Sequence, residues 1–438
     1  MRKFLVIWIG QLASLLGSEM TNFAITIWAW QVTGQATPLS LIMFFVHTPR
    51  VIASLFAGVL VDRYSRKLLM IIGDLVAGIS TIALLLLFLS NSLQIWHLYC
   101  TAAVNSLFGF IQGLAYSASL SLLVPPQQYN RVTALNSVQM SGAFILAPAL
   151  AGGLYPVIGL RGILIIDLMT FVIAIATLSI VSIPQPDRDE ADRHKIININ
   201  MAIAHGCETQ PCLAIKQDLS FGWRYLLKHR SLLAILSFLL IINFIDSFNF
   251  AILPAMVLAR SNNDPTVWGR LLTTFGVGGV LGAMTMSIWN LPKKRINGLL
   301  IGNAVWKGGL ILLSVTQSMA GKLIAAIVSG FCSPFPNSSS QGIWMSQVSP
   351  EIQGRVFAAR DLIAGIATPL GAAIAGVLVD NYFQPAMETD SMLAGLFGGI
   401  FGNSSGAGMA VAIALFSAIG VTVSFIGYIL PPLRKVED

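Results

Sequence analysis

The sequence predicts an all-α membrane protein with twelve transmembrane helices, arranged as two pseudo-symmetric halves of six. Three observations predict this fold class. The 438 residues are 55% hydrophobic and only 10% charged, whereas soluble domains carry about 25% charged residues. Apolar stretches of about 20 residues, the length that crosses a bilayer as a helix, recur along the chain. Short sequence matches also recur at one fixed spacing between the two halves.

Twelve apolar segments account for the predicted spans, and Pro, Gly or polar clusters separate them. The first resembles a signal peptide, but its apolar run continues to about Trp30 without a convincing cleavage site, so we expect a retained helix. A long polar segment follows the sixth span. We therefore predict an N-terminal half over 1–184, a cytoplasmic linker over 185–230 with an in-plane amphipathic helix at 218–229, and a C-terminal half over 231–438. The spans are expected at 4–31, 39–61, 68–90, 94–123, 131–157, 161–184, 231–258, 267–290, 297–318, 321–347, 355–380 and 407–430.

Lys and Arg are distributed unevenly between the two sides of these spans. Twenty of the 26 fall on the side that holds both termini and the linker. Because cytoplasmic loops are enriched in Lys and Arg, we expect a multi-pass protein of the cytoplasmic (inner) membrane with both termini in the cytoplasm. The net charge of +7 then reflects topology and contact with anionic lipid, and no nucleic-acid-binding motif accompanies it.

An offset of 224 residues aligns the two halves of the chain. It brings Pro126 onto Pro350 and Arg131 onto Arg355, so that PQQYNRVTA and PEIQGRVFA occupy the same cytoplasmic loop in each half. Two six-helix halves joined by a cytoplasmic linker are typical of a secondary transporter whose substrate binds near the bilayer midplane, between the halves.

The loop between the second and third spans, GVLVDRYSRK, concentrates charge in an otherwise apolar chain. It resembles the signature of the major facilitator superfamily in this loop, Gly-x-Leu-x-Asp-Arg-x-Gly-Arg-Lys, with Ser65 in place of a Gly. The resemblance implies the major facilitator fold and, within it, the drug, macrolide and siderophore exporters. It also implies a conformational latch that joins the halves in the outward-facing state. The latch residues would be Gly58, Asp62, Arg63, Arg66 and Lys67.

A physical argument supports the latch, because the N-terminus of the helix beginning near Arg355 would favour the negative charge of Asp62. The alternative is that these charges only fix the topology.

The fifth span contains APALAGG, which resembles the Gly-Pro-x-x-Gly-Gly pattern of exporters in the family. Pro148 and Gly152 match the pattern, and Ala147 and Ala151 replace two glycines. We expect Pro148, Gly152 and Gly153 to form a helix-packing motif, because small residues allow helices to approach closely. The alternative is ordinary small-residue packing.

The fourth span reads GFIQG where the family has Arg-x-x-Gln-Gly. Gln112 fits, but Gly109 replaces an Arg that relatives use in proton coupling. A standard proton relay is therefore not expected from this motif.

Ionisable residues within a span are costly in a bilayer and are therefore candidate functional groups. Glu19 and Arg50 lie roughly 16 to 18 Å from the outer ends of their spans, at about 1.5 Å per residue. We predict an ion pair between them, although Arg50 could instead contact an anionic substrate. Lys307, in a span that is peripheral in the family, is expected to pair or snorkel.

Asp246 lies 15 residues into the seventh span, as Glu19 does in the first. Asn243 and Asn249 lie three residues to either side of it, which predicts one polar stripe on a helix. We expect a role in ion coupling or substrate contact, with an interhelical hydrogen-bond network as the alternative. The candidate cavity residues are Glu19, Arg50, Gln112, Asn243, Asp246 and Asn249.

These features predict a secondary active exporter of organic small molecules that works by alternating access as a proton-coupled antiporter. The alternatives are a nutrient importer or facilitator of the same fold, a lipid-translocating protein, or a membrane-embedded enzyme. The chain has no GxxxxGK[ST], HExxH or Gly-x-Ser-x-Gly motif, so an enzyme is not expected. Four cysteines without a CxxC pair and five scattered histidines predict neither a metal site nor a cofactor. We expect a monomer whose partners are the substrate, the coupling ion and membrane lipid, and not nucleic acid.

Overall fold

The computed structural model describes residues 1–438 apart from 182–220, 289–293, 389–390, 435 and 438. The described part is helical and contains no strand. Eleven of its helices are long and apolar enough to cross a membrane. One of these, α6 (Tyr129–Ile180), contains two of the predicted spans, because Gly159 adopts φ 63° and turns the chain there. With α6 divided at Gly159, the described helices match the twelve predicted spans.

The N-terminal half contains six spans. The second predicted span is divided after Ser54 into two helices, and Ser65 starts the third. The Ser65 hydroxyl accepts a hydrogen bond from the backbone N–H of Leu68 and so caps α4 at the position where the family signature has Gly. The elements of this half are α1 (Arg2–Thr33), α2 (Ala36–Ser54), α3 (Ala57–Arg63), α4 (Arg66–Leu89), α5 (Ile95–Leu123), the 3-10 helix η1 (Pro126–Gln128) and α6.

The C-terminal half repeats this plan with more irregular connections. Most of the predicted linker, with Cys207 and Cys212, lies outside the described residues, and the predicted in-plane helix is helical over 221–228. The segment 381–406 contains two short helices, α15 and α16. The elements are α9 (Arg230–Ala259), α10 (Pro265–Ile288), α11 (Arg295–Val315), α12 (Met319–Cys332), α13 (Pro334–Gln347), α14 (Gln353–Leu378), the π-helix η2 (Val379–Phe383), α15 (Gln384–Glu388), α16 (Met392–Phe401), α17 (Ala407–Ile429) and α18 (Pro431–Arg434).

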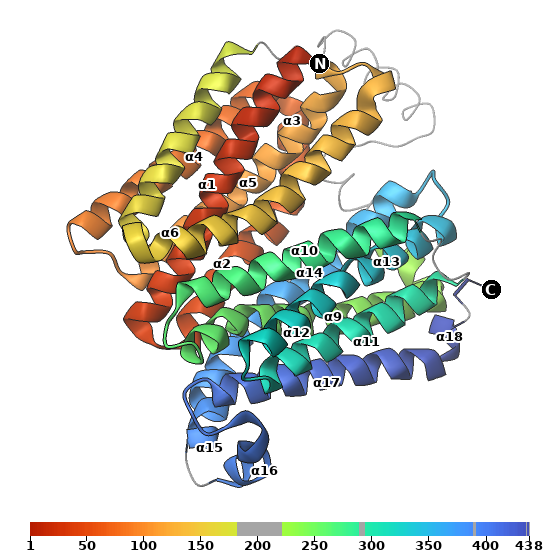
Figure 1. The fold of residues 1–438 in the computed structure, drawn as a ribbon. Coiled ribbons are helices and arrows are strands. Elements are labelled where there is room, and N and C mark those ends of the chain that lie inside the picture. The colour runs from red at the N-terminus through yellow and green to blue at the C-terminus, as the bar shows by residue number, and fades with distance from the viewer. Residues whose placement is uncertain (182–220, 289–293, 389–390, 435, 438) are drawn as a thin grey trace.

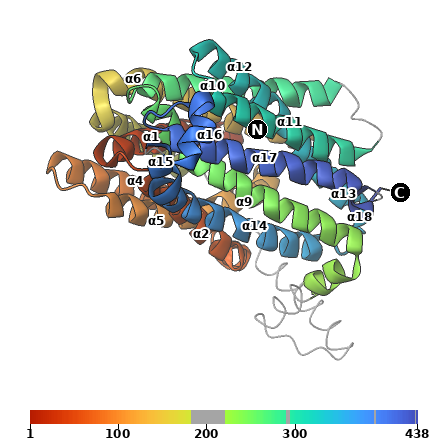
Figure 2. The ribbon, with the colours of Figure 1, turned by 90° about the horizontal axis from the view of Figure 1, so that it is seen from below.

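The two halves form separate helix groups that meet at one end and diverge toward the end that carries both termini (Figure 1). Two helix pairs provide most of the packing between them, α2 with α14 and α6 with α10. The view from below shows α2, α14 and α9 running side by side (Figure 2). We call the two ends of the molecule the terminus end and the far end. The space between the halves therefore widens toward the terminus end.

Candidate functional site

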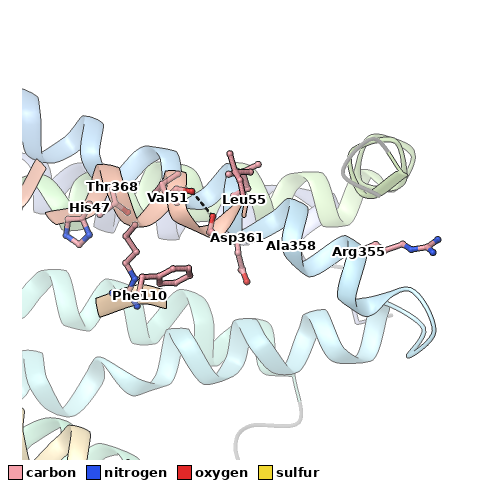
Figure 3. A pocket seen from close by; sticks show the side chains of 12 residues that line it. His47, Val51, Leu55, Phe110, Arg355, Ala358, Asp361 and Thr368 are labelled. Carbon is pink, nitrogen blue, oxygen red and sulfur yellow. Dashed lines mark hydrogen bonds between the residues drawn. The ribbon is translucent and has the colours of Figure 1, made fainter. Parts of the chain in front are cut away.

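A cavity of about 600 Å³ lies between α2 and α14, one of the two helix pairs that join the halves. Its walls are largely apolar, with Val51 and Leu55 from the second span and Phe110 from α5 (Figure 3). Ala358, from the second turn of α14, also lines it, so the cavity reaches toward the terminus end. Small-molecule sites usually have volumes of about 300–1,000 Å³ and apolar walls with a few polar groups. The cavity is thus suited to an organic molecule.

Arg50 is the predicted candidate that lines this cavity, together with His47 one turn earlier on α2. The Cζ atom of its guanidinium lies 5.5 Å from the centroid of the Phe110 ring. Among the described residues, no acidic side chain lies within ion-pair distance of Arg50. The one lining carboxylate, Asp361, is bound by the Nε and Nη2 atoms of Arg360 at 2.8 and 2.7 Å.

The predicted ion pair between Glu19 and Arg50 is wrong for this conformation. The polar neighbour of Glu19 is instead Asn22, on its own helix. Counting residues along two helices estimates depth, but it does not fix the rotation of either helix. Arg50 faces the gap between α2 and α14, so the carboxylate of α1 does not reach it.

Asp246 forms its ion pair with Lys307 of α11. The Lys307 side chain is fully buried, and its Nζ atom lies 4.2 Å from the centroid of the Trp306 ring. The Asp246 side chain is 18% exposed. A buried lysine needs such a partner, since an unpaired charge in this environment is strongly destabilising. The expected pairing role of Lys307 is therefore found, with a partner that spacing alone did not identify.

Asn243 and Asn249 do not extend from Asp246 as one stripe into the cavity. The Nδ2 atom of Asn243 donates to the carbonyl oxygen of Ala364 on α14 at 3.1 Å. The Nδ2 atom of Asn249 donates to the Ser417 hydroxyl on α17 at 3.0 Å. The three polar residues of α9 thus contact three different helices of their own half, which is the interhelical network given above as the alternative.

A second buried carboxylate, Asp74 of α4, binds the predicted candidate Gln112. The Nε2 atom of Gln112 donates to Asp74 at 2.6 Å, and that of Gln11 at 3.1 Å. A Cβ atom on Gly73 would lie 2.7 Å from the Cβ atom of Gln112, so the glycine allows α5 to approach. Asp74 is only 3% exposed and has no cationic partner among the described residues.

Asp167 in the second part of α6 is the other buried carboxylate of the N-terminal half that has only neutral partners. It accepts hydrogen bonds from the hydroxyls of Thr81 at 2.8 Å and Ser18 at 3.4 Å. Sequence reasoning placed Asp74 and Asp167 nearer to the ends of their spans and did not select them. The sequence feature that could have indicated Asp74 was its partner Gln112, which belongs to the fourth-span motif.

Asp380 binds the N-terminus of α2 across the two halves at the far end. Its carboxylate accepts hydrogen bonds from the backbone N–H groups of Ala36 at 3.0 Å and Thr37 at 2.7 Å, and from the Thr37 hydroxyl at 2.6 Å. The first N–H groups of a helix have no partner within it, and the helix dipole favours a negative charge there. We call this set of contacts the far-end clasp. Sequence reasoning missed it, because the partners lie more than 340 residues apart.

The second helix pair, α6 with α10, packs closely at the far end. A Cβ atom on Gly269 of α10 would lie 2.6 Å from the carbonyl oxygen of Pro148, and one on Gly152 would lie 3.1 Å from the Cα atom of Gly269. Pro148 and Gly152 thus lie at a contact between the halves. Gly153 does not contribute, since a Cβ atom there would meet nothing within 4 Å. The indole N–H of Trp30 adds a 2.6 Å hydrogen bond across the halves to Asn263.

The charged loop at the terminus end makes its described contacts within the N-terminal half. The Nη1 atom of Arg66 donates to the carbonyl oxygen of Ala118 at 2.6 Å. Lys67 donates to the carbonyl oxygens of Ser179 and Val181 at 3.1 and 2.8 Å. Two further latch residues, Asp62 and Arg63, are exposed.

Asp62 has no hydrogen-bond or ion-pair partner among the described residues. A Cβ atom on Gly58 would meet nothing within 4 Å, so no other helix packs closely against this glycine in this conformation.

Comparison with known proteins identifies the family. The sequence profile of the Major Facilitator Superfamily matches residues 7–372. The chain is 26% identical over 383 residues to macrolide efflux protein A of Streptococcus pyogenes, covering 86% of this chain and 90% of that protein. It is 22% identical over 385 residues to the multidrug efflux pump Tap of Mycolicibacterium fortuitum, covering 84% of this chain and 88% of Tap.

Solved structures of transporters share the fold. A bacterial homolog of the human lysosomal transporter Spinster, in an inward-facing conformation, matches with a TM-score of 0.68 and 11% identity over 99% of this chain and 98% of its own. A bacterial homologue of the iron transporter ferroportin, also inward-facing, matches with a TM-score of 0.63 and 14% identity over 97% and 98% of the two chains. These proteins are transporters and not enzymes. The chain belongs to the Major Facilitator Superfamily of membrane transporters, as its loop motif predicts.

Proposed function

We propose that this chain exports bulky organic small molecules across the cytoplasmic membrane by alternating access. The observation that carries the proposal is the cavity between α2 and α14, which lies between two halves that are joined at the far end and diverge at the terminus end. The names of its relatives, a macrolide efflux protein and a multidrug efflux pump, support export of such molecules. The excess of Lys and Arg at the terminus end supports a cytoplasmic location for both termini.

In this proposal the structure corresponds to the state that takes up substrate from the cytoplasm. The far-end clasp and the Gly152–Gly269 contact hold the outer side closed. In the opposite state the latch loop approaches the start of α14, and Asp62 meets the N-terminus of that helix. The exposed position of Asp62 is compatible with a partner that is present only in the other state.

Energy coupling is assigned to carboxylates within the spans, with protons as the driving ion. Asp246 remains the candidate in the C-terminal half, where protonation would break its ion pair with Lys307. Asp74 and Asp167 join it as candidates in the N-terminal half, because both are buried with only neutral hydrogen-bond partners. Ionisable groups inside a span are costly, so their presence there suits a functional role such as binding and releasing a proton.

Flux measurements in proteoliposomes test this function. With the protein inserted in a known orientation and an inward-acidic pH gradient, a bulky organic molecule such as erythromycin or fluorescein should accumulate in vesicles whose terminus-end face is exposed outside, beyond the level reached in protein-free vesicles. Asp246→Asn should abolish uphill accumulation while downhill exchange survives. Accumulation only in the opposite orientation would identify an importer. Equal flux with protein-free vesicles would refute transport of this class of molecule.

A further inference from the structure

The cavity between α2 and α14 has an unbalanced charge among the side chains that line it. Arg50 projects into it from α2, and no acidic group of the described residues lies within ion-pair distance. The lining carboxylate of Asp361 is already bound by Arg360. The cavity therefore holds a guanidinium whose charge the protein leaves uncompensated.

The deeper carboxylates of the described residues do not reverse this balance. Asp246 is engaged by Lys307, and Asp74 is enclosed by two glutamine amides. None of these carboxylates lines the cavity. A cationic molecule in the cavity would meet the Arg50 guanidinium and a single carboxylate, that of Asp361, which Arg360 already binds. An anionic molecule would instead meet the guanidinium of Arg50, which no carboxylate of the described residues pairs with.

An arginine within a membrane span is costly unless it has a partner or water, so its presence indicates a functional contact. The planar guanidinium matches carboxylate, sulfonate and phosphate groups in a two-point hydrogen-bonded geometry. It lies 5.5 Å from the Phe110 ring centroid, where the ring face supports its orientation. Next to it, Val51 and Leu55 form an apolar wall suited to a hydrocarbon or aromatic body (Figure 3).

We propose that this cavity binds an amphipathic organic anion and that Arg50 contacts its acidic group. The inference rests on the transport function proposed above and names the charge class of its substrate. The specificity is then opposite in sign to that expected for a cationic drug. His47, three residues before Arg50 on the same helix, lies where it adds a second hydrogen-bonding group to the same acidic head.

Two dyes that share a xanthene ring system and differ in charge test the proposal. Purified protein in nanodiscs is titrated with fluorescein, an anion near neutral pH, and with rhodamine 6G, a cation, and binding to empty nanodiscs is subtracted. Fluorescein should bind more tightly than rhodamine 6G. Arg50→Gln should weaken fluorescein binding by about 10- to 100-fold, the range for hydrogen bonds to a charged group, without weakening rhodamine 6G binding.

Two further variants sharpen the result. Arg50→Glu should reverse the preference between the dyes, which a change in folding would not do. Arg270→Gln is the matched control, because it removes an exposed arginine of α10 that does not line the cavity, and it should leave both affinities unchanged. Thermal unfolding of each variant checks that the protein is folded.

The outcomes separate this inference from the proposed function. Tighter binding of rhodamine 6G by the wild type, or an Arg50→Gln effect that is absent or equal for both dyes, would overturn the anion site. Fluorescein transport that does not depend on Arg50 would overturn it as well, while the exporter function would stand. Arg50-dependent fluorescein binding without flux of any dye or erythromycin would support the site and refute the exporter.

Discussion

Replacing Asp380 with Asn tests whether the far-end clasp holds the protein in the observed conformation. The substitution keeps the size of the side chain but removes its charge and turns one acceptor oxygen into a donor NH₂ group. The clasp consists of three hydrogen bonds to one carboxylate, two from the backbone of α2 and one from the Thr37 hydroxyl. At least one of these contacts must be lost in the variant.

The size of the effect follows from these contacts. A hydrogen bond to a charged group contributes about 1.5–3 kcal/mol, and a charge at a helix N-terminus about 0.3–1 kcal/mol. Asp380 is only partly buried, and water replaces some of the lost interaction when the clasp opens. We therefore expect a net shift of about 2 kcal/mol toward the state that is open at the far end, or roughly 30-fold in the ratio of the two states.

Distances between spin labels measure this ratio directly. Gln127 and Glu351 are exposed, and they occupy equivalent loops of the two halves at the terminus end. Asn91 and Gln317 are exposed in loops at the far end. With the four native cysteines replaced, Asp380→Asn should shorten the distances of the Gln127–Glu351 pair and lengthen those of the Asn91–Gln317 pair.

A matched control separates the clasp from helix capping in general. Asp264 also accepts a hydrogen bond at a helix N-terminus, from the backbone N–H of Thr266 at 2.8 Å, but both residues belong to the C-terminal half. Asp264→Asn should therefore leave both label distances unchanged. Equal distance distributions for wild type and Asp380→Asn, with the control behaving as stated, would refute the reasoning.

Four other substitutions extend the test of these contacts. Asp62→Asn should leave expression unchanged and reduce transport at least tenfold; normal flux would contradict the latch. Combining Asp62→Asn with Asp380→Asn should return the label distances toward those of the wild type, because each state then loses one clasp. Distances that stay at the values of the Asp380→Asn variant would argue against reciprocal clasps. Gly269→Ala places a methyl group against a backbone carbonyl and should lower the Tm of the purified protein by several degrees; an unchanged Tm would show that the contact is loose. Lys307→Met leaves the Asp246 carboxylate unpaired, at a cost of about 3 kcal/mol in stability. Adding Asp246→Leu should restore the yield of folded protein in size-exclusion chromatography. A double variant with no better yield than Lys307→Met alone would disprove the pairing.

The helices and their order could be predicted from the sequence because a bilayer imposes a simple length and polarity rule. The family could be predicted because the loop motif depends on local spacing, which folding does not rearrange. The partner of each buried charge could not be predicted in the same way. Asp246 and Glu19 occupy equivalent positions in the predicted first and seventh spans, yet Asp246 pairs with Lys307 of α11, whereas Glu19 has Asn22 of its own helix as its polar neighbour. Depth depends on residue count, whereas pairing depends on helix rotation and packing.

The α2–α14 pair explains why a clasp at each end would produce two states. The two helices are antiparallel, since Asp380, after the end of α14, contacts the start of α2, and the middle of the pair meets where Val51 lies 3.6 Å from a Cβ atom placed on Gly365. Asp62 follows α2 at the terminus end, as Asp380 follows α14 at the far end. Asp380 meets the N-terminus of the opposite helix in this structure, and we propose that Asp62 meets that of α14 in the opposite state. The two halves cannot close at both ends while a cavity lies between the helices, so engagement of one clasp requires release of the other. In the proposed mechanism, a substrate anion bound at Arg50 would lie between Asp380 and Asp62, where a small change in the angle between α2 and α14 would exchange one contact for the other.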